Sequence, residues 1–332
     1  MIRSAKRRSL AAPLVAALLA TGCGASVEPA AQNGPAPVTV TNCGVPVPYP
    51  RPQRPVSYDV SGTEKMFALG LADRMRGYVM NAQAEPSIAG SPWRADYARV
   101  PRLGTSRITR EIVVDAQADW VLAGWGSGFS EERGITPQLL DQLGIRSYVH
   151  TETCWDYGDK QPVPPLEALY ADLHNLGRIF GVEQRAAELV SELRARISKV
   201  QEGRPVVGEP VPVFVYDSGA DQPYTAGRHA APTDIIAAAG GRNVLADVGK
   251  GWTTVGWEAV VAAKPEVIVI IDYAGQSAAA KQAFLESLPA MRSVPAVQQK
   301  RYFVLSYGDA VSGPRNVKGA EDFAAYLRSI GR

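Results

Sequence analysis

The chain has 332 residues, of which 46% are hydrophobic, 20% charged and 8% aromatic, as is typical of a globular protein with about two domains. This composition excludes a mainly disordered chain, a fibrous rod and a multi-pass membrane protein, because the one long apolar stretch lies at the N-terminus. The formal net charge is +2, but residues 1–22 carry four basic and no acidic side chains; removing these four from 35 leaves 31 basic against 33 acidic side chains, a net charge of −2. A domain this close to neutrality lacks the basic surface that binds nucleic acid.

Residues 1–22 are predicted to be a lipoprotein signal peptide. A basic segment precedes an apolar stretch, Leu10–Ala20, which is too short to span a bilayer. The following LATGC resembles the lipobox of bacterial lipoproteins, so Cys23 is expected to carry the lipid that anchors the mature protein to the extracytoplasmic face of the cell membrane. The alternative is an ordinary signal peptide with an incidental cysteine. Residues 23–48, rich in Ala, Pro and Gly over most of their length, are expected to form a flexible tether.

The chain contains three cysteines, Cys23, Cys43 and Cys154. If Cys23 carries lipid, an even pair remains, and in an oxidising compartment Cys43 and Cys154 are expected to form a disulfide. The alternative is a metal or thiol site, because His150, Glu152 and Cys154 alternate and would share one face of a strand. Their spacing matches no zinc-site pattern, so no metal site is predicted.

Strands and helices are predicted to alternate in two halves of the chain. Apolar strands are expected at residues 54–58, 119–123 and 145–149, and again at 213–216, 267–272 and 302–305. Helical patterns lie between them, and such alternation indicates α/β units around a parallel sheet. We therefore expect an N-terminal α/β lobe at residues 49–164 and a C-terminal α/β lobe at 203–332.

A helical pattern of unusual length separates the two halves. Apolar residues recur at spacings of three and four from Pro165 to Val200. Gly177 and Gly181 are the positions at which this helix could bend. Residues 165–202 are therefore predicted to be a single long helix that joins the lobes.

One segment of the first half matches a segment of the second without gaps. Residues 111–123 (EIVVDAQADWVLA) align with residues 258–270 (EAVVAAKPEVIVI), and each segment reads as a short helix followed by a buried strand. Glu111 and Glu258 begin the two segments. Either the lobes are structural copies with these glutamates in equivalent places, or two generic helix–strand units coincide.

The chain lacks the common catalytic motifs. No nucleophile elbow, P-loop, dinucleotide-binding glycine motif or zinc-protease motif is present, and the three histidines are far apart in the sequence. The protein is therefore not expected to be an enzyme. Instead, aromatic residues follow the predicted strands, where open α/β sheets bind ligands. The candidate ligand-binding residues are Trp125, Trp155, Tyr224, Arg228, Trp252, Tyr273 and Arg315. For each aromatic residue, ordinary packing is the competing explanation.

Together, the lipobox, the two α/β halves, the long helix and the aromatic loops resemble the substrate-binding proteins of ABC importers for ferric siderophores, haem and cobalamin. The most similar stretches are residues 54–71, 110–123, 223–247 and 257–270. The resemblance implies a class III periplasmic-binding-protein fold, in which two Rossmann-like lobes are joined by one long helix. It also places Tyr224, Trp252 and Arg315 at ligand-contacting positions. Thr105 or Ser106 stands where cobalamin binders carry a stacking Trp, so cobalamin is not favoured over a siderophore chelate.

The resemblance further implies that the protein captures a bulky metal chelate, above all a ferric siderophore, and delivers it to a permease dimer and its ATPase. Glu111 and Glu258 would each pair with permease arginines. The protein would need no cofactor and no metal ligand of its own, since the chelate brings the Fe or Co, and it is expected to be a monomer. Haem, a corrinoid and a deazaflavin precursor are alternative ligands. An extracytoplasmic enzyme or a ligand sensor on the same scaffold is the alternative class.

Overall fold

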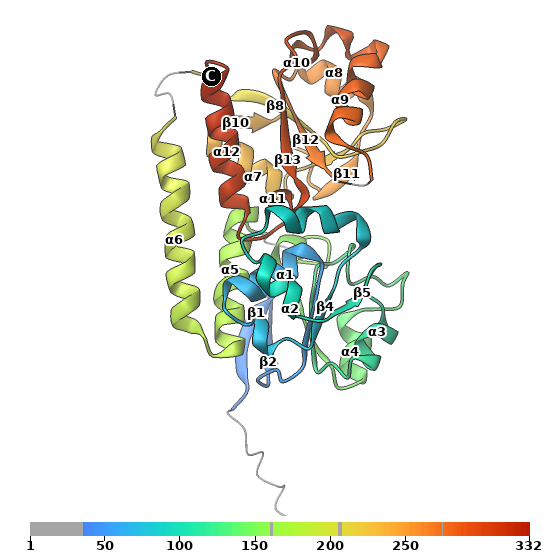
Figure 1. Cartoon of the computed structure of the whole chain (residues 1–332), viewed down its shortest axis with the longest axis vertical. Coiled ribbons are helices and arrows are strands. Elements are labelled where there is room, and N and C mark those ends of the chain that lie inside the picture. The colour runs from blue at the N-terminus through green and yellow to red at the C-terminus, as the bar shows by residue number, and fades with distance from the viewer. Residues whose placement is uncertain (1–35, 160–161, 205–207, 274) are drawn as a thin grey trace, which may run out of the picture. The chain divides into compact units, whose positions relative to one another are not determined.

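The computed structural model describes residues 36–159, 162–204, 208–273 and 275–332 (Figure 1). The predicted signal peptide, Cys23 and the first part of the predicted tether lie outside the described residues. Within the described ranges, no helix combines the length and the apolar character that a membrane span requires.

The N-terminal lobe is built on a five-stranded parallel sheet with the strand order β5-β4-β3-β6-β7. Helices cover both faces of this sheet, so its central strands are buried on both sides and mostly apolar. Its strands are β3 (Pro55–Tyr58), β4 (Gly77–Val79), β5 (Arg102–Gly104), β6 (Trp120–Ala123) and β7 (Arg146–Val149). Its α-helices are α1 (Asp59–Ala68), α2 (Arg94–Arg99), α3 (Arg110–Asp115) and α4 (Pro137–Gln142).

The C-terminal lobe is built on a four-stranded parallel sheet with the order β10-β8-β12-β13, and a two-stranded antiparallel sheet lies beside it. The strands are β8 (Val211–Tyr216), β9 (Tyr224–Ala226), β10 (Gly241–Asn243), β11 (Trp252–Thr254), β12 (Val267–Asp272) and β13 (Tyr302–Ser306). The helices are α7 (Ala231–Ala239), α8 (Trp257–Ala263), α9 (Ala278–Ser287), α10 (Pro295–Gln298), α11 (Tyr307–Ala310) and α12 (Asn316–Ser329).

Apart from the edge strand β5, the two parallel sheets share one strand order. The first strand of each sheet, β3 or β8, lies between the sheet's second strand, β4 or β10, and the strand after the matched helix, β6 or β12. The matched segments therefore form equivalent units, α3–β6 and α8–β12. This arrangement supports the hypothesis that the lobes are structural copies.

The prediction of a single helix over residues 165–202 is wrong. The segment forms two helices, α5 (Pro165–Phe180) and α6 (Glu183–Glu202), and the chain reverses at Gly181, whose φ of 65° is the left-handed conformation that glycine adopts readily. Gly177 lets the two helices approach closely, because a Cβ atom there would lie 2.5 Å from the Cβ of Ala186. The apolar periodicity continues through the turn because each helix buries its own apolar face.

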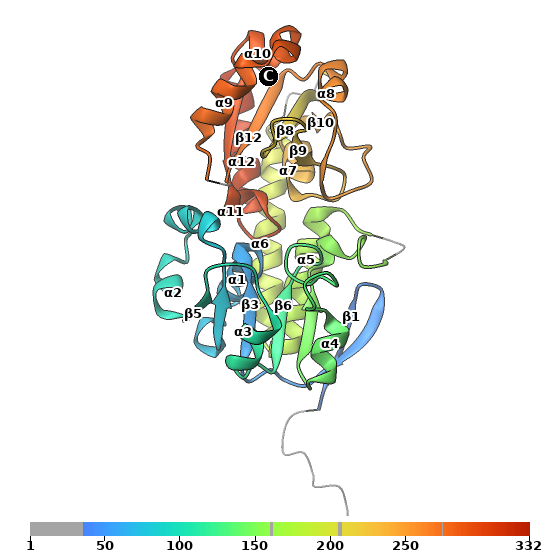
Figure 2. The same cartoon turned by 90° about the vertical axis from the view of Figure 1, so that its right-hand side faces the viewer.

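Only the second helix, α6, runs along both lobes (Figures 1 and 2). Near its start, Arg185 donates to the carbonyl of Ala68 in the N-terminal lobe. Further along, Arg196 forms a two-pronged ion pair with Glu321 on α12 of the C-terminal lobe. A helix of this length spans about 30 Å. The joining element is therefore α6 alone.

The predicted tether is also too long at its C-terminal end. β1 (Val38–Asn42) and β2 (Val45–Tyr49) form an antiparallel hairpin that packs on the N-terminal lobe. Val40 and Tyr49 are buried, and the Tyr49 hydroxyl donates to the carbonyl of Ser147. The folded unit thus begins near residue 38 rather than 49, because the hairpin buries Val40 and Tyr49 against the N-terminal lobe.

A buried charge network lies where the lobes meet. The ammonium group of Lys65 on α1 lies 2.7 Å from the carboxylate of Asp172 on α5 and 3.0 Å from Nδ1 of His150, and it donates to the Ser312 hydroxyl of the C-terminal lobe. Lys65 and Asp172 have no exposed side-chain surface. Burial acts to raise the pKa of Asp172, but Lys65 and His150 outweigh it and hold the pKa well below its usual range.

Replacing Lys65 should therefore be costly. We expect Lys65→Met to lower the free energy of unfolding by about 3–5 kcal/mol, because Asp172 would stay buried without its cation. Lys318→Met is the control, since Lys318 and Asp322 form an exposed pair whose loss costs less than about 1 kcal/mol. Urea denaturation of both variants measures the difference, and equal losses would contradict a structural role for the Lys65 network.

Candidate functional site

The carboxyl ends of the strands of both lobes meet at the lobe boundary. Asp59 directly follows β3, and its carboxylate accepts a 2.7 Å hydrogen bond from Tyr307, which follows β13 of the other lobe. Likewise, the Asn81 amide after β4 donates to the hydroxyl of Tyr273 after β12. In open α/β sheets, ligands bind beyond these strand ends. The candidate site is therefore the region between the lobes.

The C-terminal lobe provides an aromatic pair. β9 and β11 are antiparallel, and this pairing brings Tyr224 and Trp252 into a stack with ring centroids 6.0 Å apart. Tyr224 keeps 36% of its surface exposed, while partial burial raises its pKa to about 12. Two of the predicted ligand-binding residues thus contact each other and retain accessible surface.

Tyr273 lies at the boundary between the lobes. Its ring stacks on Tyr307 with centroids 4.0 Å apart and an angle of 16° between the planes. A pocket of about 400 Å³ beside it is lined from both lobes, by Ala82, Gln83, Pro86, Asp272, Tyr273, Gly275, Gln276 and Ser277.

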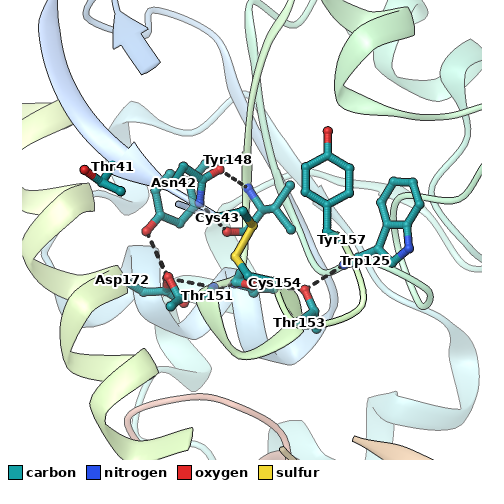
Figure 3. Close-up of a disulfide and its surroundings, with 12 residues drawn as sticks. Thr41, Asn42, Cys43, Trp125, Tyr148, Thr151, Thr153, Cys154, Tyr157 and Asp172 are labelled. Carbon is teal, nitrogen blue, oxygen red and sulfur yellow. Dashed lines mark hydrogen bonds and ion pairs between the residues drawn. A yellow bond between two sulfur atoms is a disulfide. The ribbon is translucent and has the colours of Figure 1, made fainter. Parts of the chain in front are cut away.

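Trp125 lies on the loop after β6 in the N-terminal lobe. It is half-buried and packs against Tyr157, with ring centroids 4.6 Å apart. Its backbone amide donates to the Thr153 hydroxyl, so it is tied to the loop after β7 (Figure 3). Trp125 thus lies on a strand-end loop, as the sequence predicts.

Trp155 is engaged across the lobe boundary. Its indole stacks on His229 with centroids 5.4 Å apart, and the Lys250 ammonium lies 5.4 Å from the indole centroid. Both partners belong to the C-terminal lobe. In this structure Trp155 connects the lobes instead of presenting a free face to a ligand.

Arg315 is buried between the lobes, whereas the sequence suggests a residue that is open to a ligand. Only 3% of its surface is exposed. Its guanidinium binds Asp309 at 2.6 Å and Glu64 of the other lobe at 3.4 Å, and its remaining donors bind the Ser87 carbonyl and the Ser306 hydroxyl. The arginine therefore joins the lobes. Arg228 is exposed, and its guanidinium contacts Ala246 and Asp247 of its own lobe.

Arg107 is a candidate that sequence reasoning missed. It is exposed on the loop after β5, where one guanidinium nitrogen donates weakly, at 3.3 Å, to the Ser127 carbonyl. Burial raises the pKa of Tyr58 in the N-terminal lobe and of Tyr224 and Tyr273 in the C-terminal lobe, and the Arg107 charge acts against all three shifts. The available signal was its place beside Thr105 and Ser106, where the resemblance puts a stacking Trp.

Two buried aspartates were also missed. Asp59 and Asp217 each follow a tyrosine at the end of the first strand of their lobe, and burial raises the pKa of both. Asp59 has a φ of 62°, and its Oδ1 is buried without a hydrogen-bond partner. The repeated Tyr-Asp pair was the sequence signal. Such strained, desolvated residues cluster at functional sites.

Glu111 and Glu258 lie apart from this region. Each occupies the first turn of its helix, α3 or α8, and each is exposed. They belong to equivalent units of different lobes. Within the described ranges, no group of three or more His, Cys, Asp or Glu side chains is arranged to hold a metal ion.

Comparisons with known proteins agree with this geometry. A protein-family model described as periplasmic binding protein matches residues 56–307. The uncharacterized ABC transporter substrate-binding lipoprotein YvrC of Bacillus subtilis is 27% identical over 95% of this chain and 94% of its own length. A vitamin B12-binding protein of Photorhabdus laumondii is 27% identical over 67% of this chain and 72% of its own. The crystal structure of an ABC-type Fe3+-hydroxamate transport system from Saccharomonospora viridis is 26% identical, with a TM-score of 0.73 over 88% of this chain and 99% of that chain.

Glu64 should make stability depend on pH. Burial raises its pKa from 4.5 to about 7, and Arg315 lowers it only in part, because that guanidinium lies closer to Asp309. The stability that protonated Glu64 provides is present below about pH 4.5 and is lost as the pH rises through about 7. Glu64→Gln cannot ionise, so its free energy of unfolding relative to wild type should rise by on the order of 2 kcal/mol from about pH 5 to about pH 8.

Urea denaturation at several pH values measures this difference. Comparing variant with wild type removes the opposing titration of His150, whose pKa is lowered to about 4 by burial and Lys65. The exposed Glu202→Gln is the control and should leave the profile unchanged. A constant or falling difference for Glu64→Gln would refute the prediction.

Proposed function

Because the chain belongs to the periplasmic binding protein family, we propose that it captures a bulky metal chelate, above all a ferric siderophore, between its lobes and delivers it to the permease of an ABC importer. The observation that carries the proposal is the group of Tyr224, Trp252, Tyr273 and Arg107 at facing strand ends. Aromatic faces suit the apolar periphery of a chelate, and an arginine suits its anionic oxygens.

Membership of this family supports the part of the proposal that concerns transport. Its members are substrate-binding transport proteins, which confirms the expectation that the chain is not an enzyme. Two of the relatives are named for vitamin B12 and Fe3+-hydroxamate, which fit a corrinoid and a siderophore. Haem and a deazaflavin precursor are the other alternative ligands for the same site. The absence of a metal-ligating cluster among the described residues suits a ligand that arrives with its metal already chelated.

We also propose that a lipid on Cys23 holds the protein on the extracytoplasmic face of the membrane. The lipobox supports this anchor, and the similar YvrC is named a lipoprotein. In such a position, Glu111 and Glu258 would dock one lobe each onto the two halves of a permease. Their exposure and their equivalent places in the lobes support this role.

Ligand binding should depend on Trp252 and Arg107. Titrating a ferric hydroxamate, a ferric catecholate, haem and cobalamin against intrinsic tryptophan fluorescence should identify the best ligand. For that ligand, Trp252→Ala should weaken binding by about 5- to 150-fold, the effect of losing about 1–3 kcal/mol of stacking, while Trp252→Phe should retain most of the affinity. Arg107→Ala should weaken an anionic chelate similarly, whereas the neighbouring exposed Arg110→Ala should not. Unchanged affinity in both alanine variants would refute the assigned site.

Docking can be tested apart from binding. The double variant Glu111→Ala/Glu258→Ala should keep wild-type affinity for the ligand and abolish its uptake by cells, because arginine–carboxylate pairs would no longer orient the protein on the permease. The control is Glu183→Ala/Glu188→Ala, which removes two exposed carboxylates from α6. If the glutamates only favour the first turns of their helices, worth at most about 1 kcal/mol each, the double variant will transport normally.

A further inference from the structure

The loop His150–Asp159, which follows β7, reaches across the lobe boundary at two points. Trp155 lies against His229 and Lys250, and the position of a Cβ on Gly251 would be only 3.3 Å from its indole. Glu152 accepts a 2.8 Å hydrogen bond from the backbone amide of Ala231 in the first turn of α7. One short loop of the N-terminal lobe thus makes aromatic, cationic and hydrogen-bond contacts with the other lobe.

The same loop is anchored within its own lobe. The predicted Cys43–Cys154 disulfide is present and joins the loop to the hairpin turn, across 111 residues of sequence (Figure 3). Cys154 directly precedes Trp155. The Thr153 hydroxyl holds the amide of Trp125, and both the amide and the hydroxyl of Thr151 donate to Asp172.

The β1–β2 hairpin, which carries Cys43, is hydrogen-bonded to the rest of the N-terminal lobe at several points. The Asn42 side chain exchanges two hydrogen bonds with the backbone of Val149 at the end of β7. Arg178 and Asn175 on α5 donate to carbonyls of β1. The disulfide therefore connects the loop to an element that is bound to both the sheet and α5.

We propose that the loop His150–Asp159 is an interlobe brace that fixes the separation of the lobes, and that the disulfide keeps the brace stiff. Without the disulfide, the backbone on either side of Trp155 would lose its covalent link to the hairpin and keep the short-range hydrogen bonds between loop residues, such as those from the amides of Asp156 and Tyr157, besides the side-chain contacts of Thr151 and Thr153. Loops held in this way open locally at low free-energy cost. This role goes beyond chelate capture, because it concerns contacts between lobes and needs no ligand.

The competing explanation is that the disulfide only stabilises the whole fold by restricting the unfolded chain. Hydrogen exchange distinguishes the two, because individual amides report on individual contacts. The Ala231 amide bonds to Glu152 of the brace. The Leu166 amide on α5 bonds to Asp234 in the same turn of α7, through a contact that includes no brace residue. The Val244 amide bonds to Val213 within the C-terminal lobe.

The experiment compares the wild-type chain with Cys43→Ser/Cys154→Ser by hydrogen exchange followed by NMR, without ligand. We expect the Ala231 amide to exchange about tenfold faster in the variant, while the Leu166 and Val244 amides change by less than about threefold. Unchanged exchange at Ala231 would overturn the proposal. Equal acceleration at all three amides would also overturn it, because the disulfide would then act on the whole fold.

A second variant keeps the proposal testable if the serine variant does not fold. Trp155→Ala retains the disulfide and removes the reach across the boundary, so it should accelerate exchange at Ala231 selectively. The same selective effect is expected when the folded wild-type protein is reduced with a water-soluble phosphine. If Trp155→Ala leaves exchange at Ala231 unchanged, Trp155 does not brace the lobes.

Discussion

The Lys65 ammonium group is completely buried, and the need to surround this charge with polar partners constrains how the two lobes are arranged. A charge without solvent is tolerated only when other polar groups surround it, and Lys65 finds Asp172 on α5, His150 after β7 and Ser312 in the other lobe. These partners come from elements far apart in the sequence. Moving Asp172 would leave the Lys65 charge unpaired in the interior, and moving His150 or Ser312 would remove one of its hydrogen-bond partners. The network therefore holds α1, α5 and the two lobes in one arrangement.

The remaining contacts across the boundary extend this arrangement. Arg315 with Glu64 lies on one part of the boundary, Tyr307 with Asp59 on another, and the brace loop contributes Glu152 and Trp155. Several of these groups are acidic and desolvated: burial raises the pKa of Glu64 and of Glu152 to about 7. The hydrogen bonds between the lobes therefore depend on which of these buried carboxyl groups are protonated.

Much of the fold could be predicted from the sequence, because strand and helix patterns are local. The alternating units, the matched segments and the disulfide all rest on spacing or on counting. The resemblance marked Tyr224 and Trp252 separately, and their contact follows from the pairing of β9 with β11, which was not predicted. The break at Gly181 could not be predicted, since both helices bury apolar residues and the periodicity runs on. The sequence also could not tell that Arg315 and Trp155 face another lobe, because periodicity shows that a residue is covered but not what covers it. Arg107, by contrast, lay beside Thr105 and Ser106, where the resemblance puts a stacking Trp, and it was overlooked because it is not aromatic.

The shared strand order of the lobes has a consequence for how this protein can change over evolutionary time. The strand-end loops of each lobe lie at the boundary between the lobes. The buried charges that align the lobes belong to other residues. Substitutions in the loop that carries Arg107, or in the β9 and β11 segments that carry Tyr224 and Trp252, would alter one wall of the proposed ligand site and leave the alignment intact. Selectivity can therefore be retuned one wall at a time, so a lineage can acquire new cargo without redesigning its scaffold.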